Sequence, residues 1–189
     1  MIRVLKIDDL ERDLKPMLNL LKDLGIKEYN KLIREILKEN SAENRIIVIE
    51  KDSKREEIFL ASSKNLELIL KNIGDEMLSF GLKIGEIRVG KIRKDFIPAR
   101  EFLEFLLKKS DFKINHLIIN EKSEWLFICK RDLFSKGIAK ENRIFGNSFL
   151  ILNKNKECLG IGRQGFFKNK RIVKNIFDIG DFLRRERAH

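Results

Sequence analysis

One segment near the C-terminus combines many cations with aromatic side chains and contains no acid. No Asp or Glu occurs from Cys158 to Phe177, and Phe166 and Phe167 lie inside this stretch. Its five cations are Arg163, Lys168, Lys170, Arg171 and Lys174. Ammonium and guanidinium groups neutralise phosphates, and aromatic rings stack on unpaired bases. The segment therefore predicts a surface that binds a polyanion.

The charge of the chain is unevenly distributed. Residues 1–119 carry 24 Lys and Arg against 21 Asp and Glu, a net charge of +3, whereas residues 120–189 carry 16 against 8, a net charge of +8. This asymmetry favours nucleic acid or an anionic membrane as the partner. Two plainer interpretations stay open: the cations form a solvated face, and Phe166 and Phe167 pack in the core. A second, weaker group of cations consists of Lys130, Arg131, Lys136 and Lys140.

Composition excludes several classes of protein. No apolar run approaches the about 20 residues that span a bilayer, and the first residues lack a signal core, so we expect a soluble cytoplasmic protein without a membrane partner. Cys129 and Cys158 each lie in a strand-like apolar segment, which predicts buried free thiols. His116 and His189 lack the partner spacing of a zinc site. We expect no metal.

Two glycine motifs resemble nucleotide-binding loops without meeting their requirements. Residues 85–92 place Ile92 where a phosphate loop needs a hydroxyl for magnesium, and the segment alternates like a strand. Residues 160–165 fit the dinucleotide pattern of glycines, but no helix and acidic residue follow at the required distances. We expect strand glycines in both cases and no cofactor. Asp178 and Asp181 are typical of a helix cap, so the sequence predicts a protein that is not an enzyme.

Apolar periodicity predicts an α/β N-terminal domain over residues 1–112 with antiparallel pairing. Runs at 46–49 and 58–61 indicate a hairpin, and the alternation over 83–89 indicates a half-buried strand. The expected helices begin at Lys15 or Pro16, cover 29–37 and 66–73, and begin again at Pro98.

The remaining residues, 113–189, predict a small β-barrel-like domain, so the fold class is α+β. Short strands are expected at 117–119, 125–129, 149–152 and 158–161. A short helix is expected around 131–135 and a helical turn after Asp178.

The C-terminal third resembles the Nip-seven family of ribosome-biogenesis factors. The resemblance rests on residues 178–186, Asp-Ile-Gly-Asp-Phe-Leu-Arg-Arg-Glu, preceded by the glycines of 159–162. Residues 125–138 are similar to the opening of that family's PUA domain, and residues 78–81 with 96–107 are similar to the segment that closes its N-terminal domain. The resemblance covers about residues 75 to 189.

The resemblance implies a PUA protein that binds RNA without catalysis and acts as an assembly factor in large-subunit rRNA maturation. The expected RNA-binding residues are Arg163, Lys168, Lys170, Arg171, Lys174 and Lys136. The implied partners are precursor rRNA and other assembly factors. The chain departs from the eukaryotic members by a longer, Lys-rich N-terminal region and a more basic terminus, which suggests an archaeal-type relative. The alternative is an RNA-modification enzyme or its PUA-containing targeting subunit, although residues 1–112 show no nucleophile motif.

Overall fold

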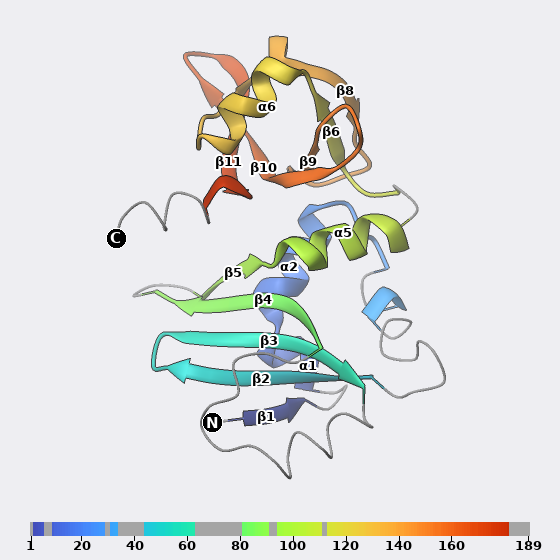
Figure 1. Cartoon of the computed structure of the whole chain (residues 1–189), viewed down its shortest axis with the longest axis vertical. Coiled ribbons are helices and arrows are strands. Elements are labelled where there is room, and N and C mark those ends of the chain that lie inside the picture. Colours follow the sequence, from blue (N-terminus) through green and yellow to red (C-terminus); the bar gives the residue numbers. More distant parts are fainter. Residues whose placement is uncertain are drawn as a thin grey trace. The chain divides into compact units, whose positions relative to one another are not determined.

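The computed structural model describes residues 2–5, 9–28, 31–33, 44–62, 81–90, 94–110 and 113–181 (Figure 1). The chain forms two compact units. One consists of Met1–Asn19 with Lys27–Phe102, and the other of Leu20–Ile26 with Leu103–His189. The division falls inside the helices α2 (Lys15–Asp23) and α5 (Arg100–Lys109), while the boundary expected at residue 112 stays a prediction.

The N-terminal unit contains a five-stranded antiparallel sheet in the order β1-β2-β3-β4-β5. The strands are β1 (Ile2–Leu5), β2 (Asn44–Asp52), β3 (Arg55–Ser62), β4 (Leu82–Val89) and β5 (Lys94–Pro98). Apolar side chains are buried on both faces, because neighbours such as Ile47 and Val48 point in opposite directions and are both buried. Helix α1 (Leu10–Asp13) precedes α2 in this unit.

The hairpin predicted from runs 46–49 and 58–61 is confirmed as β2 and β3. Its loop is short, because the strands extend beyond the two apolar runs and only Ser53 and Lys54 separate them. The Asp52 carboxylate accepts a hydrogen bond from the Lys54 backbone N–H at 2.8 Å, which stabilises the turn locally. The strand predicted at 83–89 and the helix predicted to begin at Lys15 are also confirmed.

The sequence analysis expected a helix to begin at Pro98, but the structure shows none there. Pro98 ends β5, a strand that the sequence analysis missed, and α5 begins at Arg100. Proline is tolerated at a strand end, where its missing N–H leaves no ladder bond unmade. The helices expected at 29–37 and 66–73 lie wholly or largely outside the described residues.

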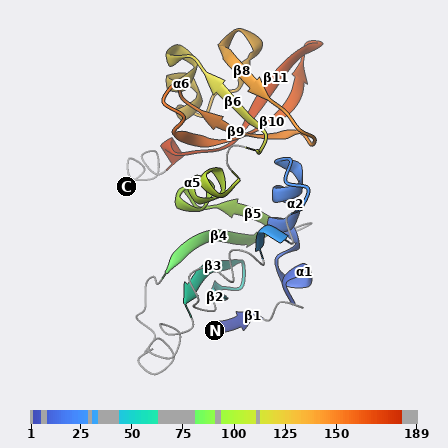
Figure 2. The same ribbon diagram turned by 90° about the vertical axis from the view of Figure 1, so that its right-hand side faces the viewer.

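The C-terminal unit is built on a six-stranded mixed sheet in the order β7-β11-β10-β9-β6-β8. Only the β6–β9 pair is parallel among the described strands. The sheet curls into a barrel-like form, with α6 (Glu121–Ile128) beside it (Figures 1 and 2). The strands are β6 (His116–Ile119), β7 (Leu133–Phe134), β8 (Ile138–Asn142), β9 (Ser148–Leu152), β10 (Cys158–Phe167) and β11 (Lys170–Asp178).

The interior of this sheet is a single apolar cluster. Its members come from almost every element: Leu117, Ile119, Phe127, Leu133, Phe149, Ile151, Leu159 and Val173. The sequence correctly predicted β6 and β9 and the start of β10, and the α+β fold class is confirmed. It missed the length of β10, together with β8 and β11.

The segment around Trp125 is a helix, not the strand that its apolar composition suggested. Asn120 caps α6 by accepting a hydrogen bond from the Ser123 backbone N–H at 2.9 Å, and such a cap outweighs a weak β preference. The helix expected at 131–135 is instead β7 followed by the short 3-10 turn η3 (Ser135–Gly137). Cys158 is buried as expected, but Cys129, at the end of α6, is exposed.

Candidate nucleic-acid interface

The acid-free basic segment forms the hairpin of β10 and β11. Arg163 pairs with Lys174, Phe166 with Arg171, and Phe167 with Lys170. Lys168 and Asn169 make the turn with φ angles of 47° and 61°. Two successive residues with positive φ define the type I′ turn, whose twist matches that of the flanking strands. The sequence analysis identified this basic segment but did not predict that it forms a hairpin.

The hairpin presents two faces, because side chains alternate along each strand. Val173 belongs to the apolar cluster, and by register Phe166 and Arg171 share its face of the hairpin, although Phe166, close to the turn, is exposed. The opposite face carries Phe167, Lys170 and Lys174, which are all exposed. We call these three residues, together with Phe134 and the turn residue Lys168, the outer face.

Phe134 joins the outer face through strand pairing. Phe134 lies opposite Ile172, which shares a face with Lys170 and Lys174. Its side chain is 53% exposed, the same fraction as that of Phe167, and Phe166 is 67% exposed. The open alternative that Phe166 and Phe167 pack in the core is therefore wrong. Phe134 was missed because the sequence placed it in a helix, far from the basic segment.

Two of the predicted RNA-binding cations are held by carboxylates of the same unit. Arg171 donates two hydrogen bonds to Glu141, at 3.0 and 2.6 Å. Arg163 Nε lies 3.4 Å from Asp23 Oδ2 and donates to Ser148 Oγ at 3.3 Å. Paired guanidinium groups neutralise phosphate less effectively than unpaired cations. These two arginines therefore stabilise the domain through their carboxylate partners and are less available to a ligand.

The predicted lysines differ from these arginines. Within the described part of the chain, Lys136, Lys168, Lys170 and Lys174 are exposed and have no ion pair with a carboxylate. Lys168 Nζ lies 5.6 Å from the centroid of the Phe167 ring, within cation–π range. Lys136 follows Phe134 in η3, and the hydroxyl of its neighbour Ser135 donates to the Arg171 carbonyl at 3.4 Å. The structure thus brings all four lysines to the β7–β11–β10 part of the sheet.

The weaker group of cations is dispersed. Lys130 has a positive φ of 67°, and its Nζ donates to the Ile176 carbonyl at 3.1 Å while lying 3.8 Å from an Asp178 oxygen. It therefore ties the end of α6 to β11. Arg131 is exposed after α6, and Lys140 lies on β8. Lys136 lies on a further element, η3.

Asp23 and Asn115 organise a polar hub inside the C-terminal unit. The Asp23 carboxylate accepts hydrogen bonds from the Ser148 hydroxyl and, at 3.1 Å, from the Asn147 backbone N–H, besides its ion pair with Arg163. The Asn115 amide donates to the carbonyls of Asp23 and Ser148 at 3.3 and 3.1 Å. This hub attaches residues 20–26 to β9 and β10.

Gly160 and Gly162 lie within β10, which is followed by the turn at Lys168 and by β11 instead of the helix that the dinucleotide motif requires. Gly160 has a φ of 148°, and a Cβ atom there would lie 2.0 Å from the backbone oxygen of Phe177. At Gly162 a Cβ would meet the side chain of Val173 at 2.4 Å. Close approach of neighbouring chain explains both glycines, as the sequence analysis expected. In the other motif, Gly85 lies in β4, and Lys91 and Ile92 lie outside the described residues.

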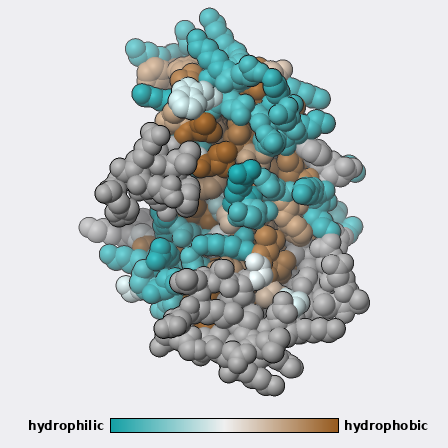
Figure 3. Space-filling view, viewed as in Figure 1, coloured by the Kyte–Doolittle hydropathy of each residue, from teal (hydrophilic) through white to brown (hydrophobic). Residues whose placement is uncertain are grey.

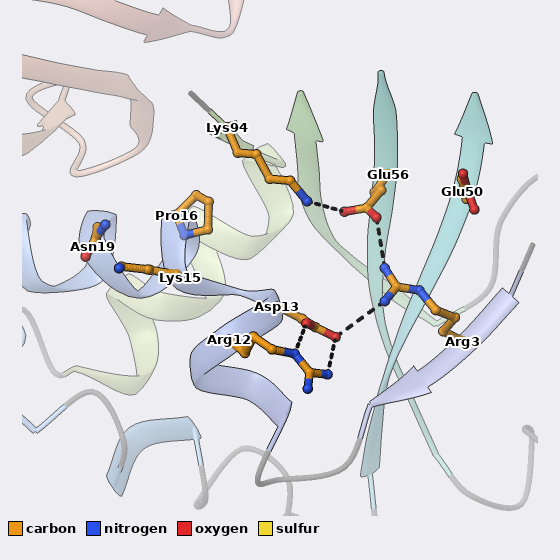
Figure 4. A pocket seen from close by; sticks show the side chains of 9 residues that line it. All are labelled: Arg3, Arg12, Asp13, Lys15, Pro16, Asn19, Glu50, Glu56 and Lys94. Carbon is orange, nitrogen blue, oxygen red and sulfur yellow. Dashed lines mark hydrogen bonds and ion pairs between the residues drawn. The ribbon is translucent and has the colours of Figure 1, made fainter. Parts of the chain in front are cut away.

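The N-terminal unit contains a depression of about 630 Å³ that is lined by side chains of both charges (Figure 4). Arg3 lies 2.8 Å from Glu56 and 3.4 Å from Asp13, and Lys94 lies 4.0 Å from Glu56. The hydrogen bond from Arg12, together with the charges of Arg12 and Arg3, holds the pKa of Asp13 below its usual value against the opposing effect of burial. These ion pairs connect α1 to β1 and β3, which assigns the network to the fold.

Other kinds of site find little support in the described residues. They contain no group of three His, Cys, Asp or Glu side chains placed to hold a metal ion. None of the helices among them is long and apolar enough to cross a bilayer. Hydrophilic side chains gather over much of the C-terminal unit on the face drawn in Figure 3.

The C-terminal unit matches a known domain family. Residues 115–187 match the family model described as the UPF0113 PUA domain. A UPF0113 protein of Archaeoglobus fulgidus is 27% identical over 112 residues, which cover 54% of this chain and 63% of that protein. The alignment therefore spans less than two thirds of the relative's length.

Solved archaeal structures share the fold over nearly the whole chain. A hypothetical protein from Pyrococcus horikoshii has a TM-score of 0.54 at 16% identity, with 94% of each chain covered. A conserved PUA domain protein from Thermoplasma acidophilum has a TM-score of 0.52 at 14% identity, with 98% of this chain and 99% of that chain covered. A PUA domain protein from Aeropyrum pernix, solved as a tartrate complex, has a TM-score of 0.50 at 12% identity, with 97% and 88% covered. The chain thus shares an α+β fold with these proteins, and its residues 115–187 match the PUA domain model.

Proposed function

We propose that the PUA domain of this chain binds single-stranded RNA through its outer face, and that the protein acts without catalysis as an archaeal-type factor in large-subunit ribosome assembly. A PUA domain implies RNA binding at the general level, and the resemblance of residues 178–186 to the Nip-seven family supports the ribosomal role. The precursor rRNA and other assembly factors are the proposed partners, in the cytoplasm.

The observation that carries the proposal is the composition of the outer face. Phe134 and Phe167 are half exposed beside lysines that no carboxylate neutralises among the described residues. Exposed aromatic rings that share a face with exposed lysines form a surface that another molecule can cover. Unpaired bases stack on such rings while lysines neutralise the adjacent phosphates, and paired bases inside a duplex offer no such stacking surface. Single-stranded RNA satisfies both requirements.

The test is a salt titration of binding to a single-stranded RNA oligonucleotide. Each phosphate contact contributes about 0.7 to the slope of log affinity against log salt, so four contacts give a slope of about 3. Replacing Lys136, Lys168, Lys170 and Lys174 with alanine should flatten the slope and weaken binding to all sequences alike, because phosphate contacts do not read the bases. The melting temperature should change little, since the removed charges are exposed.

The control removes the same charge elsewhere. Lys54, Lys108, Lys113 and Lys122 are exposed and lie outside the outer face. Replacing these four with alanine should leave affinity and slope nearly unchanged. If both quadruple variants weaken binding equally, only net charge matters and the outer face is not the interface. A ribosomal role is checked separately, by crosslinking the full chain to RNA in cells and identifying the bound species; crosslinks to transfer or messenger RNA alone would contradict it.

A further inference from the structure

The PUA domain also has a concave site, formed by other strands than the outer face. It is a depression of about 320 Å³ on the sheet formed by β8, β6 and β9. Its lining includes His116, Ile118, Lys140, Asn142, Leu152 and Lys156. We call it the β6 pocket. Its volume lies in the range of pockets that hold small ligands.

Strand register explains why these residues share one face. In the antiparallel pair of β6 and β8, Ile118 lies opposite Lys140 and His116 lies opposite Asn142. In the parallel pair of β6 and β9, Ile118 is the partner of Leu152. Residues that are partners in register point to the same side of a sheet. Ile118 and Leu152 therefore form an apolar floor, and the polar side chains lie around it.

The polar side of the pocket is fixed before any ligand arrives. His116 Nδ1 lies 2.9 Å from the Ile114 carbonyl, which can only accept, so Nδ1 carries the proton. The Asn142 amide donates to the same carbonyl at 3.1 Å. His116 is only 8% exposed. Two hydrogen bonds to one carbonyl thus hold the imidazole and the amide in place.

The charge around the β6 pocket is positive. Lys140 and Lys156 line it, and Lys156 is held in the left-handed region at a φ of 66°. Glu141 is the acid of the lining, and both of its oxygens accept hydrogen bonds from Arg171. Arg171 therefore neutralises the one carboxylate of the described lining. An anionic group is favoured between the two lysines.

We propose that the β6 pocket binds one nucleotide of a bound RNA, with the base on Ile118 beside the His116 ring and the phosphate between Lys140 and Lys156. An apolar floor suits a planar base, the fixed imidazole and amide suit its polar edge, and the ammonium groups suit its phosphate. This inference rests on the proposed function, because it assumes that the domain binds RNA. The Arg171–Glu141 pair connects the pocket's strand β8 to β11 of the hairpin.

The test uses nucleoside 5′-monophosphates and inorganic phosphate as probes of the full chain, followed by amide chemical shifts in NMR. We expect at least one of the four mononucleotides to shift residues of β6, β8 and the turn at Lys156, with inorganic phosphate at least tenfold weaker. The double variant Lys140→Ala with Lys156→Asn should weaken that binding at least tenfold. Asparagine tolerates the positive φ of position 156, so the fold is kept.

The matched control is Lys122→Ala with Lys154→Asn, which removes the same charge from exposed positions outside the lining. It should bind the mononucleotide as the unchanged chain does. Equal binding of phosphate and mononucleotide, or unaltered binding by the pocket variant, would overturn the inference. The two proposals separate cleanly: if single-stranded RNA binds with full affinity to the pocket variant, only the β6 pocket fails, whereas if RNA does not bind the unchanged chain, the proposed function fails.

Discussion

The two units of this chain use their cations differently. In the N-terminal unit Arg3, Lys83 and Arg88 each have a carboxylate within 3 Å, in Glu56, Glu57 and Glu86. In the C-terminal unit the lysines of the outer face have no such partner among the described residues. Cations that are already neutralised support the fold, and cations without acids are available to a polyanion. Local pairing with carboxylates therefore distinguishes cations that support the fold from cations that are available to a ligand.

Some aromatic side chains of the C-terminal unit differ from those of the N-terminal unit in their exposure, although Phe127 and Phe149 are buried in its core. Phe59 and Phe102 in the N-terminal unit are buried, and Phe102 packs edge-on against Phe96 with ring centroids 6.5 Å apart. Phe134 and Phe167 in the C-terminal unit are half exposed beside lysines. Burial of Phe59 and Phe102 stabilises the N-terminal unit, whereas the half-exposed Phe134 and Phe167 contribute less to the stability of the C-terminal unit.

The largest expected effect is loss of stability in the PUA domain without any change of charge. Gly160→Ala places a Cβ against the Phe177 carbonyl at a φ that only glycine adopts easily, so unfolding should become easier by about 3 kcal/mol or more. Gly165→Ala is the matched control, because its Cβ meets only the flexible end of Lys174, at 3.0 Å. Chemical denaturation measures both. Equal destabilisation of the two variants would contradict the role given to Gly160.

A somewhat smaller effect is expected at the polar hub. Asp23→Ala removes the acceptor of Ser148, Asn147 and Arg163, and should cost about 2 to 3 kcal/mol, since hydrogen bonds to a charged group are among the stronger ones. Thermal unfolding of the full chain measures the loss. Lys22→Ala, an exposed neighbour on α2, should change the melting temperature little. An Asp23 variant as stable as the unchanged chain would show that residues 20–26 are not anchored through this carboxylate.

The next expected effect is on the affinity for RNA, through stacking of a base on Phe167, and not on the stability of the fold. Phe167→Ala should lower the affinity for single-stranded RNA by about 1 to 3 kcal/mol per stacked base, with little effect on the melting temperature because the ring is half exposed. Fluorescence anisotropy with a labelled oligonucleotide measures it. Ile144→Ala, another exposed apolar residue of the same unit, serves as the control. An unchanged affinity for Phe167→Ala would leave the exposed rings unexplained.

The smallest expected effect is a pH dependence of stability that arises from the N-terminal ion pairs of Glu57. Burial raises the pKa of Glu57, but the hydrogen bond and charge of Lys83, together with Lys51, outweigh it and hold that pKa below its usual value. A depressed pKa contributes stability above the ordinary carboxyl value, and this stability is lost as the pH falls through the lowered value. Thermal unfolding between about pH 3 and 7 should show this loss, and Glu57→Gln should flatten the acid side of the profile. RNA affinity should be the same for both chains at neutral pH.

Sequence patterns predicted the features that depend on neighbours along the chain. The hairpin of β2 and β3 and the strand β9 follow from alternating or continuous apolar runs. Helix α6 was missed because one side chain, that of Asn120, decides between helix and strand there. The basic segment was identified, but the pairing of Arg163 and Arg171 depends on carboxylates that are distant in sequence, and no local pattern contains that information.

The two faces of the hairpin could not be assigned from sequence either. They depend on where the turn lies, and Lys168 and Asn169 do not form one of the glycine-containing pairs that usually mark a two-residue loop. Neighbours on a strand always point to opposite sides, and the observed register places Phe166 on the side of Arg171 and Phe167 on the side of Lys170. Shifting the pairing by one residue would move the side chains of the shifted strand to the opposite face.

The polar hub also sets an order of events during synthesis of the chain. Asp23 and its partner Ser148 are 125 positions apart. At about 5 to 20 residues per second, a ribosome makes the second of these about 6 to 25 s after the first. Residues 20–26 leave the ribosome long before β9 and β10 exist to receive them, and such a distant contact also slows folding. The PUA domain therefore completes its fold only when nearly the whole chain has been translated, so an interrupted chain leaves α2 without the partners that hold its end.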